Sequence, residues 1–119
     1  MKIRCHANSI RLRVRKSDLE ALNEGGAVRE EVTFAPGQSL IFELRLAEVQ
    51  ALTASFRGNL ATVSVPMQLG RQWIATDEVG LEAHQEAGTS TPLHLLIEKD
   101  FPCKHQPTED KQDTFQELG

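Results

Sequence analysis

The stretch NSIRLRVRKSDLE, residues 8–20, decides the fold, because a strand pattern changes into a helix pattern within it. Its first half alternates aliphatic residues with arginines, and alternation with period two is typical of a strand with one buried face. From Ser17 onward the letters SDLE match a capping box, in which Ser17 and Glu20 exchange hydrogen bonds at a helix start. The stretch therefore predicts a strand followed directly by a short helix.

The same two patterns continue along the chain. Gly25 and Gly26 are expected to end the first helix, and a second short helix is expected after Pro66. A short strand is indicated by Ile3 and Cys5, which precede the opening stretch. Longer strand patterns cover residues 10–14, 28–34, 39–46, 52–56, 61–65, 78–84 and 92–101.

These elements predict an α+β fold. Most connections between the strand patterns are short, and short connections favour antiparallel pairing. We therefore expect a curved, mostly antiparallel sheet or a partly closed barrel of about seven strands, covered by two short helices. Residues 1–103 are expected to form this single domain. In residues 104–119 the apolar pattern stops, which predicts a polar, irregular or mobile tail.

The apolar phase of each element predicts which side chains form the core. Glu30 is an exception, because it shares its phase with apolar neighbours in its strand. Either a bulge or an edge position exposes Glu30, or it is a buried carboxylate that needs a partner. The predicted core residues are Leu12, Phe42, Leu44, Phe56, Val63, Trp73, Leu81 and Leu95.

Composition excludes several classes of protein. The 119 residues are 39% hydrophobic and 25% charged, as expected for one soluble domain. A net charge of −4 and the absence of tyrosine argue against a nucleic-acid partner. Two cysteines are too few for a disulfide scaffold, and no apolar run is long enough for a membrane span. A cytoplasmic location is therefore expected.

The arginine row formed by Arg11, Arg13 and Arg15 is the candidate ligand-binding site. The first sixteen residues contain six basic groups and no carboxylate, whereas the rest of the chain has seven basic and 17 acidic residues. Guanidinium groups about 7 Å apart on one strand face could bind phosphate or carboxylate groups. Alternatively, carboxylates of neighbouring strands neutralise the arginines, and Glu82 and Glu98 are the expected partners.

Other catalytic or metal-binding chemistry is not indicated. Cys103 and His105 are zinc-ligand types, but their spacing matches no zinc motif, so no metal site is expected. The chain has no Gly-x-Ser-x-Gly motif and no phosphate loop. We therefore expect no catalytic residue and no cofactor.

Several short motifs together resemble a family of short bacterial proteins of unknown function. They are MKIR, NSIRLR, the central F-x-PG, TDEVGLE and the closing LIEKDF-x-C, which contains Cys103. The similarity spans residues 1–103. It implies a bacterial cytosolic protein, and it supplies no activity, substrate or catalytic residue.

The function expected from the sequence is that of a non-enzymatic binding or interaction domain. Its expected partner is a second copy of the chain, paired through a sheet edge. The alternative is a phosphate- or carboxylate-binding protein, or an enzyme, that acts through Arg11, Arg13 and Arg15.

Overall fold

The computed structural model describes residues 1–101 and confirms the predicted α+β class. Neither helix in this part of the chain is long and apolar enough to cross a membrane. The elements follow one another in the order β1 (Lys2–His6), β2 (Ser9–Val14), α1 (Lys16–Gly25), β3 (Ala27–Ala35), β4 (Gln38–Ala47), β5 (Thr53–Arg57), β6 (Leu60–Pro66), α2 (Met67–Ala75), β7 (Gly80–Gln85) and β8 (Leu93–Lys99).

The strands form two four-stranded sheets, with the orders β1-β2-β8-β7 and β3-β4-β6-β5. Strands that are consecutive in a hairpin pair antiparallel, but the central pairs β2/β8 and β4/β6 are parallel. This corrects the prediction of a single sheet or partly closed barrel, whereas the mostly antiparallel pairing and the count of about seven strands are roughly matched. The length of a connection restricts only the pairing of strands that follow each other in the sequence. Each parallel pair instead joins one strand from the first half of the domain to one from the second half.

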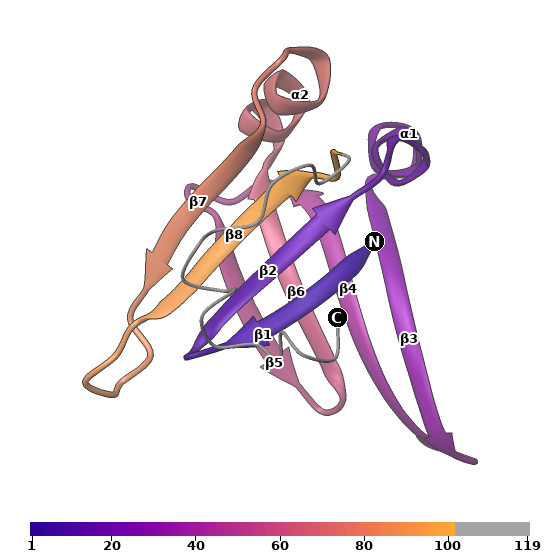
Figure 1. Cartoon of the computed structure of the whole chain (residues 1–119), viewed down its shortest axis with the longest axis vertical. Helices are drawn as coiled ribbons and strands as arrows, with labels where there is room; N and C mark the ends of the chain where they lie inside the picture. Colours follow the sequence, from indigo (N-terminus) through magenta and orange to yellow (C-terminus); the bar gives the residue numbers. More distant parts are fainter. Residues whose placement is uncertain (102–119) are drawn as a thin grey trace, which may run out of the picture.

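The two halves of the chain have the same topology, although their sequences show no repeat. Elements β1-β2-α1-β3-β4 are followed by β5-β6-α2-β7-β8, and each half places one hairpin in each sheet. Leu22 of α1 and Trp73 of α2 are fully buried and occupy the same position in their helices. Both helices therefore lie at one end of the molecule, and the hairpin turns lie at the other (Figure 1).

The core lies between the two sheets and under the helices. Two predictions are wrong: Phe42 is only partly buried, and Phe56 is 68% exposed. Both lie in the halves of their strands that approach the hairpin turns, at the end of the molecule that is opposite to the two helices (Figure 1). The other predicted core residues are buried, namely Leu12, Leu44, Val63, Trp73, Leu81 and Leu95.

The start of α1 differs from the prediction, and its end agrees with it. Asp18, rather than Ser17, caps the helix: its Oδ2 accepts a hydrogen bond of 2.9 Å from the Arg15 amide. The predicted pair of Ser17 and Glu20 is wrong because the helix already begins at Lys16. Gly26 ends the helix in a left-handed conformation with φ 81°, which glycine adopts without steric cost.

Candidate functional site

A pocket of about 390 Å³ is lined by residues of both sheets that lie toward the hairpin turns. Both sheets contribute walls to it. Strands β1, β2, β7 and β8 supply Cys5, Ile10, Gln85 and Leu93. Strands β4, β5 and β6 supply Leu40, Phe42, Ala54, Ser55, Phe56, Ala61, Thr62 and Val63.

The lining of this hairpin-end pocket is mainly apolar, and its polar residues, Ser55, Thr62 and Gln85, are uncharged. None of its lining residues within residues 1–101 is Asp, Glu, Lys, Arg or His. The Gln85 amide is already bonded, because its Oε1 accepts from the Ala54 amide at 2.7 Å and from the Thr53 hydroxyl at 2.8 Å. Its Nε2 also donates to the Ala54 carbonyl at 2.8 Å. The side chain of Gln85 thus joins β7 to β5 and forms one side of the pocket.

Phe42 and Phe56 show why alternation alone does not predict this pocket. Both have the inward phase of their strands, which is why the sequence places them in the core. Phase identifies the face of a strand that points inward, but it does not show whether another layer covers that part of the strand. At the hairpin end the inward face remains accessible, and Phe56 is 68% exposed there. Exposed aromatic groups beside an apolar pocket are typical of binding sites.

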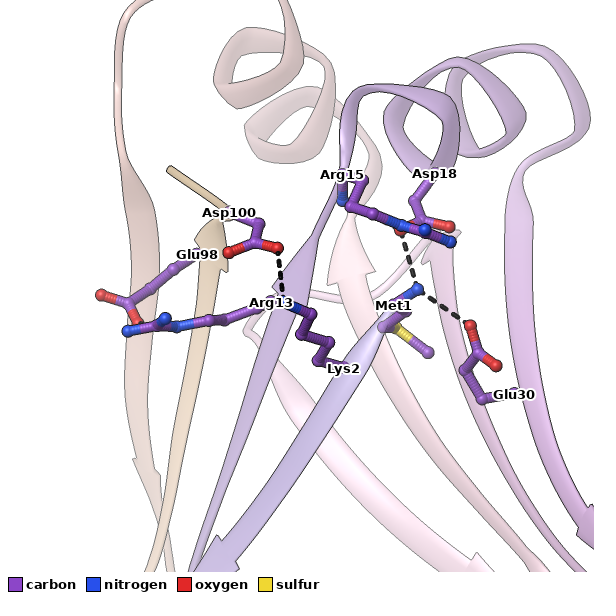
Figure 2. A network of polar contacts seen from close by, with 8 residues as sticks. All are labelled: Met1, Lys2, Arg13, Arg15, Asp18, Glu30, Glu98 and Asp100. Atoms are coloured by element: carbon purple, nitrogen blue, oxygen red, sulfur yellow. Dashed lines mark hydrogen bonds and ion pairs between the residues drawn. The ribbon is translucent and has the colours of Figure 1, made fainter. Parts of the chain in front are cut away.

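Two arginines of the arginine row lie beside a carboxylate. Arg11 and Arg13 project from the outer face of β2, and their Nε atoms lie 3.4 Å and 4.0 Å from Glu98 Oε1. The prediction that Glu98 lies beside these arginines is therefore confirmed, and Figure 2 shows Glu98 beside Arg13. The predicted pairing with Glu82 is wrong, because the Glu82 carboxylate contacts His94 instead. The phase of Glu82 is outward as expected, but β8 separates it from β2.

Arg15 contacts a different carboxylate from the one that Arg11 and Arg13 share. It stands at the start of α1, where its Nε lies 3.7 Å from Asp18 Oδ2. On β1, Arg4 lies directly opposite Arg11, so two like charges face each other across the strands. Lys2 pairs with Asp100 at 3.3 Å (Figure 2). The outer face of β1 and β2 therefore remains basic even after its ion pairs have formed.

The buried amino group of Met1 joins β1 to β3 and to α1. It lies 2.8 Å from Asp18 Oδ2 and 2.8 Å from Glu30 Oε1 (Figure 2). Glu30 therefore has a charged partner, but its side chain is still 40% exposed because β3 is an edge strand, as one of the predicted alternatives required. The irregularity in β3 lies between Thr33 and Ala35, so it does not turn Glu30 outward.

The Met1 amino group and the Asp18 carboxyl have shifted pKa values. Burial lowers the pKa of the Met1 amino group, but the hydrogen bonds and attraction from Asp18 and Glu30 outweigh burial, so the pKa is raised. Burial raises the pKa of Asp18, but the amino group, the Arg15 amide and the Arg15 charge outweigh it, so the pKa is lowered. The folded protein therefore favours the charged form of both groups.

Comparison with known proteins gives a family but no activity. Residues 1–118 match the model of a "Family of unknown function (DUF7009)". The chain belongs to this family. The match confirms the resemblance to proteins of unknown function and extends beyond residue 103, where the predicted similarity ended. No curated protein and no solved structure matches the chain.

Some predictions concern residues outside the described part of the chain. Cys103 and His105, the expected tail over residues 104–119, and the domain boundary before it belong to this group. Cys5 is described: it is exposed and lines the hairpin-end pocket.

Proposed function

We propose that this protein is a non-enzymatic binding domain that holds a small, uncharged and mainly apolar molecule in the hairpin-end pocket. The observation that supports the proposal is the lining itself, which is mainly apolar and, within residues 1–101, contains no charged residue. A charged ligand would lose its hydration in this pocket without gaining an ion pair, and that loss is unfavourable. An apolar ligand would gain from leaving water.

The size of the pocket is also that of a ligand site. Ligand pockets in proteins usually measure about 300–1,000 Å³, and this one measures about 390 Å³. Its lining supports binding rather than catalysis. Cys5 is a nucleophile, but the lining described here offers no imidazole or carboxylate to activate its thiol.

Self-association through a sheet edge receives less support from the geometry. The edge strands β5 and β7 face each other within one molecule, because Gln85 joins them. The edge strands β1 and β3 are likewise connected by the contact between Met1 and Glu30. These contacts leave less free edge for a second copy of the chain.

A second candidate function is anion binding by Arg11, Arg13 and Arg15. Arg4 and Arg11 are like charges that face each other across the strands, and this favours anion binding, since a bound phosphate or carboxylate would relieve their repulsion. The ion pairs with Glu98 and Asp18 oppose it, because an anion would have to compete with these carboxylates. Phosphate titration of the full chain and of an Arg11→Ala variant tests this candidate, which requires weaker phosphate binding by the variant.

The pocket is tested by titrating the full chain with N-phenyl-1-naphthylamine, an uncharged dye that becomes fluorescent in apolar surroundings. Leu93→Trp adds volume inside the pocket and should lower the affinity for the dye by about tenfold or more, which corresponds to about 1.4 kcal/mol. Leu96→Trp is the matched control. It makes the same change on the same strand, but residue 96 is not part of the pocket lining.

The two variants distinguish pocket binding from adhesion of the dye to the surface. Pocket binding predicts a saturable signal that Leu93→Trp weakens and Leu96→Trp leaves unchanged. Equal affinities in all three proteins, or no saturable signal with the wild-type chain, would contradict the proposal. Circular dichroism verifies that both variants are folded.

A further inference from the structure

Three potential metal ligands project together from the outer face of the β7/β8 hairpin. His84 and His94 are direct partners in the antiparallel register of β7 and β8, and Glu82 lies two residues before His84. Directly opposite residues share a face, and so do residues two apart on a strand. The three side chains are therefore neighbours, on the face opposite to the buried Leu81 and Leu95.

The side-chain geometry of this cluster is compact. The imidazole rings of His84 and His94 are stacked, with centroids 4.5 Å apart and planes 3° apart. His94 Nε2 lies 2.5 Å from Glu82 Oε2. One ligand atom from each residue can be chosen so that all three lie within 4.8 Å of one another. Ligands of one zinc ion lie at most about 4 Å apart, so small rotations of these side chains would bring them into place.

Two imidazoles and one carboxylate also select the kind of ion. Imidazole nitrogen suits zinc, copper, nickel and iron, whereas magnesium and calcium prefer sets of oxygen ligands. The paired strands hold the Cα atoms of His84 and His94 opposite each other, so the backbone needs no rearrangement. Within residues 1–101, the His84 ring makes no hydrogen bond to another side chain, which leaves its nitrogens available.

We propose that Glu82, His84 and His94 bind one divalent transition-metal ion of the zinc class on the outer face of β7 and β8. Three protein ligands leave one position of a tetrahedral zinc ion open to water or to an external ligand. The site lies on the opposite face of its sheet from the hairpin-end pocket, so it does not depend on the proposed ligand there. The sequence does not predict it, because the register of β7 and β8 is needed to bring His84 and His94 together.

Isothermal titration of the full chain with zinc chloride tests the site. Cys5→Ser and Cys103→Ser are introduced first, so that no thiol competes for zinc. In this background one zinc ion should bind per chain, and magnesium should not bind. His84→Ala or His94→Ala should each lower the zinc affinity by at least roughly tenfold to 100-fold, which is the loss typical for removing a residue that only orients a ligand.

His6→Ala is the matched control. His6 also points outward from the same sheet, but β1 is separated from β8 by β2. This variant should therefore bind zinc as tightly as the background protein. His94→Gln replaces His94→Ala if the latter does not fold. Unchanged zinc affinity in both the residue 84 and residue 94 variants, an equal loss in His6→Ala, or no zinc binding by the background protein would overturn the proposal.

Discussion

Substitution of Gly70 by alanine should destabilise the protein although alanine is the better helix former. Gly70 is buried in α2, and a Cβ atom there would overlap the Leu46 side chain and lie 3.2 Å from Val65 Cγ1. Leu46 is only 4% exposed, so it has little room to move. Alanine gains about 1 kcal/mol from helix propensity, whereas overpacking a core costs about 1–3 kcal/mol. We expect a net loss of about 1 kcal/mol, or roughly 4 °C in melting temperature.

Gly25→Ala is the control for Gly70→Ala. Gly25 also lies in a helix, but a Cβ atom there would meet nothing within 4 Å, so this variant should gain up to about 0.5 kcal/mol. Thermal unfolding followed by circular dichroism measures both variants. A melting temperature for Gly70→Ala at or above that of the wild-type protein would refute the close packing of α2 against β4 and β6.

Four further predictions concern the polar contacts. Asp18→Asn should lower stability at neutral pH by about 2 kcal/mol, which lies within the range of about 1.5–3 kcal/mol for a hydrogen bond to a charged group. Because the pKa of Asp18 is lowered in the folded state, this difference should persist above about pH 4 and shrink as the pH falls further. The pKa of the Met1 amino group is raised in the folded state, so the stability of the wild-type protein should also fall as the pH rises above about 8. Chemical denaturation at a series of pH values measures both effects. Arg13→Ala should cost less than about 1 kcal/mol, and added salt should reduce the difference, because the guanidinium is partly exposed; equal differences in low and high salt would argue against an ion-pair role. Gln85→Ala should cost about 1–3 kcal/mol and speed hydrogen exchange at the Ala54 amide, which loses its acceptor; unchanged exchange there would show that Gln85 does not hold β7 to β5.

Local patterns predicted the elements well, because each depends on neighbouring residues. The alternation in residues 10–14 predicted β2, and the glycine at position 26 predicted the end of α1. The parallel pairing of β2 with β8 could not be predicted in the same way. It joins the two ends of the domain, and neither connection length nor alternation restricts which distant strands become neighbours.

The candidate sites were harder to predict than the elements, because they depend on tertiary position. Phe56 has an inward phase, but only the assembled sheets show that it borders an open pocket. Glu98 was an expected partner of the arginines because charge and phase restricted the choice to a few carboxylates. His84 and His94 become neighbours only through the register of their strands. The phase of a residue thus predicts on which face of its strand the side chain lies. Which residues of other strands lie beside it, and whether another layer covers it, are known only from the structure.

The binding proposal is tested most directly by locating the dye on the protein with methyl NMR. Full-length chain with labelled Ala, Ile, Leu and Val methyl groups is titrated with N-phenyl-1-naphthylamine, and the shifts are assigned to residues. We predict that the largest shifts occur at Ile10, Leu40 and Leu93, which line the pocket, and that Leu22 and Leu46, buried near the helices, change little. Shifts concentrated away from the pocket, or no shifts at saturating dye, would contradict binding at the hairpin end.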